Sequence, residues 1–301
     1  MKIGMSIPLD YLLDNSKTKN ALIFKKNAGC YKDFLPTLKT MGINYIELRA
    51  IKLDTDKNLL QELINKLRKY NFAVSIHSFL PDDKTIDGRS YFSFLDDILL
   101  ELPSYQNELV ITVHTYRGIN NSYTDALESS TKMLNTLGQY IDKNNLPVKI
   151  AFELNRGDKD NDPSVTYSGL LQLYSMISFT DNIGICWDLG HTYSNVSNEK
   201  ILLEAPEKFV NKVIHTHIHG VSKQDETHQP LTMDNLPLTS FLTQLNASGY
   251  NGIYNLEINY HTMLMDNNSF WPSLKNSIQC LQRTQVTIAE TLLLTQNITA
   301  Q

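Results

Sequence analysis

Eight short apolar segments with the character of β-strands recur along this chain of 301 residues, and stretches with helical character lie between them. Parallel strands that are neighbours in a sheet need a crossover connection, and an α-helix is the usual crossover. Strands that alternate with helices in this way are typical of α/β folds. We therefore predict a (β/α)8 barrel with strands at residues 3–7, 45–48, 74–77, 109–114, 149–153, 183–188, 213–219 and 253–258.

The segments between the strands predict the helices. The clearest lie at residues 57–70, 124–143, 164–177 and 199–210, and a helix at residues 270–283 precedes a helical tail from about residue 284 to 294. No internal repeat, linker or low-complexity segment divides the chain, and β/α barrels commonly use about 250 residues for one domain. We predict a single domain over residues 1–301, with its core at about residues 2–285.

The amino-acid composition narrows the classes of protein to which this chain can belong. Hydrophobic residues make up 42% of the chain and charged residues 20%, which is ordinary for a globular domain. The formal net charge of −5 gives no support to a general affinity for nucleic acid, and no apolar run is long enough for a signal peptide or a membrane span. The three cysteines are far apart and form no CxxC pair, which fits a reducing compartment. We expect a cytoplasmic protein that does not associate with membranes.

Histidines and carboxylates gather at the ends of the predicted strands. Glu153, Asp188 and Glu257 each end a strand-like run. No histidine lies in a predicted helix; all eight follow or end a strand-like run, and they are His77, His114, His191, His215, His217, His219, His228 and His261. In a parallel barrel the carboxyl ends of the strands form the rim where the active site is built. Imidazole and carboxylate are ligands of divalent metals, so the pattern predicts a metal-dependent enzyme.

Four of these residues are the predicted metal ligands. Glu153, Asp188, His217 and Glu257 end the fifth to eighth strands, and adjacent strands bring them within reach of one ion. Three carboxylates on the barrel axis would repel one another and resist ionisation without a cation. A divalent ion resolves this conflict.

The remaining histidines have less definite predicted roles. His77, His114, His191 and His228 are expected to contact substrate or to bind an additional metal, although His191 could merely orient Asp188, and His228 could belong to a solvated loop. His215 lies one pleat deeper than His217, so we expect it to support the ligands from below. For His219 the pattern leaves the pocket and the solvent equally open.

Strand register agrees with the barrel. If each terminal ligand points inward, the residue two positions before it points inward too, and the residue between them faces the helices. Trp187 is then expected to pack between sheet and helices rather than to touch substrate. The inward positions are mostly small or polar, as a barrel interior near a site requires; they are Ser75, Thr112, Ala151, Cys186, His215 and Asn255.

The strand ends SIHSF, VTVHTY, FELNR, CWDLGH, HTHIHG and NLEIN, in this order, resemble the xylose-isomerase-like TIM-barrel superfamily. The likeness spans roughly residues 2–285. This superfamily includes sugar and sugar-phosphate isomerases and epimerases, and AP endonucleases of the endonuclease IV type. Its barrels often pair, so a homodimer is a further expectation.

The likeness to ketose 3-epimerases implies one divalent ion, Mn²⁺, Co²⁺ or Zn²⁺, held by Glu153, Asp188, His217 and Glu257. It also implies that Glu153 and Glu257 are the base and acid that move a proton through an enediolate of the substrate. The expected substrate is a small-molecule sugar or sugar phosphate, and the expected class is isomerase or epimerase in carbohydrate metabolism.

The likeness to endonuclease IV implies a different activity, phosphoester hydrolysis with three zinc ions. Its ligand places would be filled by His77, His114, Glu153, Asp188, His191, His217, Glu226 with His228, and Glu257. The segment after the seventh strand, HIHGVSKQDETHQPL, lacks the Asn-Asp-x-Lys typical of the nuclease, and the chain lacks a rich set of basic and aromatic loops for base flipping. The isomerase or epimerase is therefore the first expectation, and a nucleic-acid substrate is the alternative.

Overall fold

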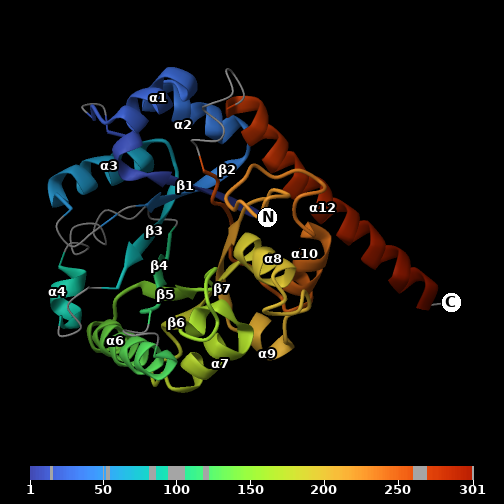
Figure 1. The fold of residues 1–301 in the computed structure, drawn as a ribbon. Helices are drawn as coiled ribbons and strands as arrows, with labels where there is room; N and C mark the ends of the chain where they lie inside the picture. Colours follow the sequence, from blue (N-terminus) through green and yellow to red (C-terminus); the bar gives the residue numbers. More distant parts are fainter. Residues whose placement is uncertain are drawn as a thin grey trace.

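The computed structural model describes residues 1–13, 16–49, 51, 55–80, 86–93, 106–117, 122–259 and 270–299. Eight parallel strands close into a barrel in the order β1 to β8, with β1 paired to β8 (Figure 1). The predicted (β/α)8 barrel is confirmed. The strands are β1 Lys2–Pro8, β2 Ile43–Arg49, β3 Ala73–Phe79, β4 Leu109–His114, β5 Val148–Glu153, β6 Ile183–Asp188, β7 Val213–Ile218 and β8 Ile253–Leu256.

Helices surround the barrel because each has one apolar face. In α3, for example, Leu60, Leu63, Ile64 and Leu67 recur at helical spacing and are buried against the sheet. The helices are α1 Lys19–Ala28, α2 Tyr31–Thr40, α3 Lys57–Lys69, α4 Gly88–Phe92, α6 Tyr123–Asn144, α7 Tyr167–Ser175, α8 Leu189–Ser197, α9 Glu207–Val210, α10 Leu238–Ala247 and α12 Phe270–Thr299, with 3-10 turns Leu9–Tyr11 (η1) and Pro163–Val165 (η3).

Two expected helices differ from the structure. The helix expected at residues 199–210 is confined to α9, which starts directly after Pro206, because a proline disfavours helical backbone in the residue before it. The helix and tail expected at residues 270–283 and 284–294 are one continuous helix, α12. It packs on α10 and α1, and its C-terminal end projects beyond the barrel in Figure 1.

The helix α8 corrects a further expectation. The sequence predicts no histidine within a helix, but His191 lies in the first turn of α8. The helix begins there because the Asp188 carboxylate accepts a hydrogen bond from the backbone N–H of His191 at 2.8 Å and so caps the helix. The strand-ending carboxylate and the histidine three residues later are thereby locked together.

Packing outside the barrel follows the predicted register. The ring of Trp187 on β6 lies 5.6 Å from that of Phe209 on α9 and 5.5 Å from that of Phe241 on α10, between centroids. Its Nε1 donates to Thr192 Oγ1 of α8 at 2.9 Å. Trp187 therefore packs between sheet and helices, as predicted.

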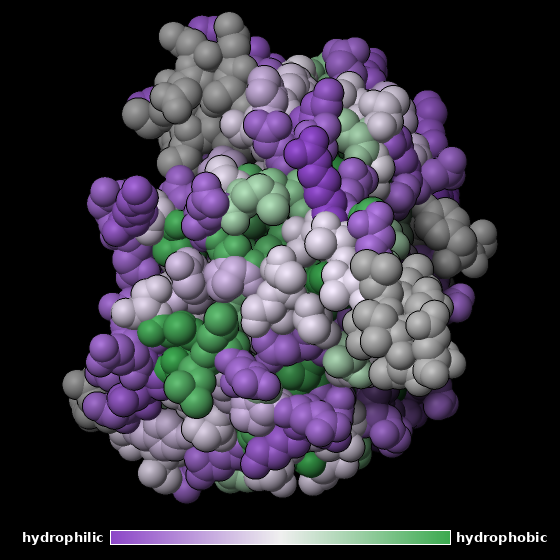
Figure 2. Space-filling model, turned by 90° about the vertical axis from the view of Figure 1, so that its right-hand side faces the viewer, coloured by the Kyte–Doolittle hydropathy of each residue, from purple (hydrophilic) through white to green (hydrophobic). Residues whose placement is uncertain are grey.

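The face that carries α10 and α12 is mixed in character. Hydrophobic residues gather there in a few patches between hydrophilic ones (Figure 2). Among the described residues, no helix combines the length and the apolar character needed to cross a bilayer.

Candidate metal centre at the carboxyl ends of the strands

One buried cluster lies at the carboxyl ends of the strands on the barrel axis. It contains His77 of β3, Glu153 of β5, His217 of β7 and Glu257 directly after β8, and their ligand atoms all lie within 4.8 Å of one another. His217 Nδ1 is 2.9 Å from Glu153 Oε1 and 2.9 Å from Glu257 Oε2, and His77 Nε2 is 3.2 Å from Glu153 Oε2. Three of the four predicted ligands thus share a cluster that also includes His77.

Asp188, the fourth predicted ligand, lies in an adjoining cluster with Glu153 and His191. Its Oδ2 is 3.2 Å from His191 Nδ1. Because Glu153 belongs to both clusters, it joins Asp188 to the other three predicted ligands. The structure therefore brings all four to one continuous site, with Glu153 at its centre.

A third cluster consists of His191, His219 and His228, whose ligand atoms also lie within 4.8 Å of one another. The ring centroids of His219 and His228 are 4.2 Å apart, and Asp188 Oδ1 is 3.1 Å from His219 Nε2. His219, for which the sequence left two possibilities, is fully buried and faces the site. Burial lowers the pKa of all three imidazoles, that of His219 to about 4, so each is neutral at pH 7.

The expected pairing of Glu226 with His228 is not found. Glu226 is exposed, and its carboxylate lies 3.4 Å from Ser222 Oγ. His228 instead lies against Glu257, whose backbone carbonyl is 3.1 Å from His228 Nδ1. The loop after β7 turns the histidine inward and the neighbouring carboxylate outward, which a sequence pattern alone does not distinguish.

His114 lies at the mouth of the site. Its Nε2 is 2.8 Å from Glu153 Oε2, and 42% of its side chain is exposed. Burial opposes the charged form of His114, but the charge and hydrogen bond of Glu153 outweigh it and raise the pKa of this histidine. The exposed ring of Phe79 lies beside it, with centroids 6.3 Å apart, and adds an apolar wall to the mouth.

The electrostatics of the cluster fit a divalent cation. Burial raises the pKa of Asp188 to about 6. Burial also opposes ionisation of Glu153 and Glu257, but His217 and other nearby positive groups hold the pKa of both carboxyls well below the usual range. Asp188 Oδ2 and Glu257 Oε2 are buried and accept no well-formed hydrogen bond from the part of the chain that the structure describes. A divalent ion would use these lone pairs, and imidazole with carboxylate suits manganese, cobalt or zinc.

Sequence reasoning missed Glu47 altogether. It lies on β2, fully buried, and its Oε2 is 2.9 Å from His215 Nε2 and 3.1 Å from His217 Nε2. The available signal was its place two residues before the end of β2, the same depth as the other inward positions. His215 is fully buried and lies against this carboxylate; that it supports the proposed ligands from below stays a prediction.

Gly190 is required where β6 turns into α8. A Cβ built at this residue would lie 2.0 Å from Cε1 of His219, well inside contact distance. Because both groups are enclosed, we expect Gly190→Ala to destabilise the protein by about 1–3 kcal/mol and to displace His219. Chemical denaturation of the wild-type protein and Gly190→Ala measures the change in the free energy of unfolding. Gly249→Ala is not a suitable control, because Gly249 has a φ of 74° and an alanine there would be strained. Ala247→Ser in α10 is the control, and its effect on the free energy of unfolding should be smaller.

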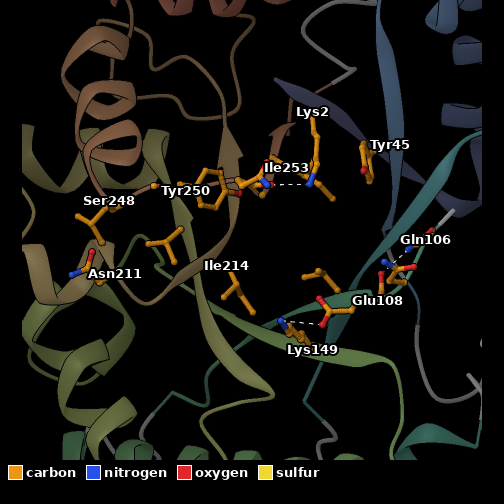
Figure 3. Close-up of a pocket in the computed structure, with 17 residues that line it drawn as sticks. Lys2, Tyr45, Gln106, Glu108, Lys149, Asn211, Ile214, Ser248, Tyr250 and Ile253 are labelled. Carbon is orange, nitrogen blue, oxygen red and sulfur yellow. Dashed lines mark hydrogen bonds and ion pairs between the residues drawn. The ribbon is translucent and has the colours of Figure 1, made fainter. Parts of the chain in front are cut away.

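A cavity of about 480 Å³ lies at the opposite, amino-terminal end of the strands (Figure 3). Its polar groups pair with one another: Lys149 Nζ is 3.0 Å from Glu108 Oε1, and Lys2 Nζ donates to the Asn251 carbonyl at 2.9 Å. Reacting groups of β/α barrels lie at the carboxyl ends of the strands, so this cavity is not the candidate site.

The closed parallel barrel places this chain among the (β/α)8 proteins, and its buried imidazole–carboxylate clusters are groups that could hold a metal ion. Comparison of the sequence with family models matches residues 35–284 to the xylose isomerase-like TIM barrel. The chain belongs to this family. No curated protein matches its sequence.

Solved structures similar to this barrel cover nearly the whole chain. A D-tagatose 3-epimerase-like protein is 18% identical with a TM-score of 0.65, covering 97% of this chain and 100% of its own. D-psicose 3-epimerase, solved in the presence of D-fructose, is 12% identical with a TM-score of 0.63, covering 96% and 99%. A xylose isomerase domain protein from Alicyclobacillus acidocaldarius is 14% identical with a TM-score of 0.62, also covering 96% and 99%. At these identities the similarity shows the fold.

Proposed function

We propose that the protein is a divalent-metal-dependent isomerase or epimerase of a sugar or sugar phosphate. The observation that carries the proposal is the buried cluster in which Glu153 links His217 and Glu257 to Asp188. Family membership and the similar epimerase structures support the same class of reaction. Glu153, Asp188, His217 and Glu257 would hold the ion, with Mn²⁺, Co²⁺ or Zn²⁺ suited to this donor set.

When bound, the ion supplies a Lewis acid that polarises the carbonyl of the substrate and stabilises negative charge on its oxygens. Glu153 and Glu257 are ionised in the cluster, so either carboxylate can accept a proton from the carbon next to the carbonyl. Loss of that proton leaves an enediolate of the substrate. Return of the same proton to the neighbouring carbon gives an isomer. An epimer forms when the carboxyl on the opposite face, first protonated from solvent, donates a proton to the original carbon, and the first carboxyl then releases its proton to solvent.

His77 and His114 lie on the side of Glu153 that opens to the mouth, where they would donate to hydroxyl groups of the substrate. His191 and His228 would do so from the other side.

A second candidate is a multi-zinc phosphoester hydrolase, because the site offers more ligands than one ion needs. The observation in its favour is the cluster of His191, His219 and His228 beside Asp188. The outward position of Glu226 argues against it, since the nuclease resemblance required this carboxylate with His228. We therefore rank it second.

Metal content distinguishes the two candidates. We expect about one Mn, Co or Zn ion per chain when protein purified without chelator or affinity-tag metal is measured by elemental analysis. Such protein should exchange a carbon-bound proton of a ketose or ketose phosphate with deuterated water. Two or three zinc ions per chain, together with cleavage of abasic-site DNA, would replace the proposal by the hydrolase.

A further inference from the structure

The carboxylate of Glu47 lies one layer below the proposed metal ligands and is enclosed by hydrogen-bond donors. Its Oε1 accepts from the Ser6 hydroxyl and from Asn255 Nδ2, the latter at 2.9 Å. Its Oε2 lies 2.9 Å from His215 Nε2, and His217 Nε2 contacts both carboxylate oxygens, at 3.0 Å from Oε1 and 3.1 Å from Oε2. Glu47, His215 and His217 are fully buried, so this network is shielded from solvent.

This arrangement determines which nitrogen of His217 carries hydrogen toward the barrel interior. An ionised carboxylate only accepts hydrogen bonds, so His217 must present an N–H at Nε2. The opposite ring nitrogen, Nδ1, then faces Glu153 Oε1 and Glu257 Oε2, each at 2.9 Å. In metal sites the hydrogen bond made by one imidazole nitrogen decides which nitrogen binds the ion.

We propose that Glu47 is the positioning residue that holds His217 with its Nε2–H toward the barrel interior and its Nδ1 toward the metal site. The inference rests on the proposed function for the presence of an ion at Nδ1. Glu47 does not belong to the upper cluster of His77, Glu153, His217 and Glu257, so it acts through His217 rather than on the substrate. His215 holds the carboxylate from the other side and keeps it below the site.

A cation bound by Glu47, His215 and His217 themselves is the competing interpretation, because their ligand atoms also lie within 4.8 Å of one another. Such an ion would need both Nε2 atoms without hydrogen. The donors around Glu47 argue against such an ion, because the Ser6 hydroxyl and Asn255 Nδ2 donate to Oε1, and the Nε2 atoms of both imidazoles lie within hydrogen-bond distance of the carboxylate. Both oxygens of Glu47 thus have hydrogen-bond donors from the chain itself.

The first test compares Zn²⁺ affinity, by calorimetry, in the wild-type protein, Glu47→Gln and Ser6→Ala. We expect Glu47→Gln to weaken binding about 10–100-fold, as removal of such supporting partners does in other metal sites. Ser6→Ala removes a donor to the same carboxylate without touching His217, so it should change the affinity far less. Equal affinities for Glu47→Gln and wild type would overturn the inference, and thermal melts of the metal-free proteins show whether each variant folds.

The second test needs no variant. Two-bond ¹⁵N–¹H correlation spectra of the histidine side chains in zinc-loaded wild-type protein should show His217 with hydrogen on Nε2 and the metal on Nδ1. Zinc on Nε2 of His217 or His215 would overturn the inference in favour of the lower cation site. In metal-free protein Nε2 of His217 must still carry hydrogen. If Nε2 of His217 carries no hydrogen in the metal-free protein, the inference about Glu47 is overturned. If the wild-type protein binds no ion, only the proposed function is overturned.

Discussion

Glu257→Gln is expected to lower kcat for the isomerised or epimerised sugar by about 10²–10⁴-fold, the usual contribution of a proton-transfer group. The amide oxygen still reaches the metal site, but an amide does not accept and return a proton at neutral pH. The variant should therefore bind substrate weakly while losing turnover. Initial rates on the substrate found by deuterium exchange measure the effect.

Glu226→Gln is the matched control, because it makes the same chemical change on an exposed side chain outside the cluster. It should keep wild-type kcat. Wild-type turnover by Glu257→Gln would remove this residue from proton transfer and leave it, at most, a ligand. Glu153→Gln should lose turnover too, and it should also lose metal, since Glu153 belongs to both clusters around the proposed ion.

Metal removal is expected to destabilise the protein, and the loss should grow as pH rises from 6 to 8. Burial alone would lower the pKa of His217, but Cys186 and the carboxylates of Glu47, Glu257 and Glu153 raise it well above its usual value. A metal at Nδ1 must displace the proton there, so each ion bound should release about one proton. Affinity should then rise roughly tenfold per pH unit until this histidine titrates.

The metal-free form is expected to lose stability as pH rises, whereas the metal affinity increases. A group with a raised folded-state pKa stabilises below its unfolded value, about 6.5 for histidine and 3.9 for aspartate, and loses that contribution as pH rises through the folded value. His217 and Asp188, whose pKa is raised to about 6, are such groups. The lowered carboxyls Glu153 and Glu257 contribute above about pH 4.3 and change little in this range.

Thermal or denaturant melts of chelator-treated and metal-loaded protein, at several pH values, measure this difference. At an ion concentration 100 times the Kd found at pH 6, binding adds about 2.7 kcal/mol to the free energy of unfolding at that pH. Because Kd falls as pH rises, the difference between the two forms at this fixed ion concentration should widen with pH. A difference that is independent of pH between 6 and 8 would show that the ion does not displace the His217 proton.

The chain's local patterns predicted the positions of the eight strands and the depth of the residues near their ends. Side chains alternate between the two faces of a strand, and apolar runs bounded by polar residues mark where the strands lie. This alternation alone places Trp187 outside the barrel and His215 inside it, before any contacting residue is known. Helix boundaries were less well predicted. In residues 199–210 the helix starts only after Pro206, and at the end of β6 the Asp188 side chain caps α8, so that this helix starts directly after the strand.

Local sequence by itself thus determined the barrel and the set of imidazoles and carboxylates on one rim, because these depend on periodicities that short segments express. The family followed from the resemblance of the strand-end motifs and from the match of residues 35–284 to the family model. Only the tertiary structure decided which members of that set meet. Closure of the barrel brings Glu47 of β2 against His217 of β7, separated by 170 residues, and the loop after β7 turns His228 inward and Glu226 outward. Such contacts depend on strand register, barrel closure and loop geometry, which are set by packing of the whole chain.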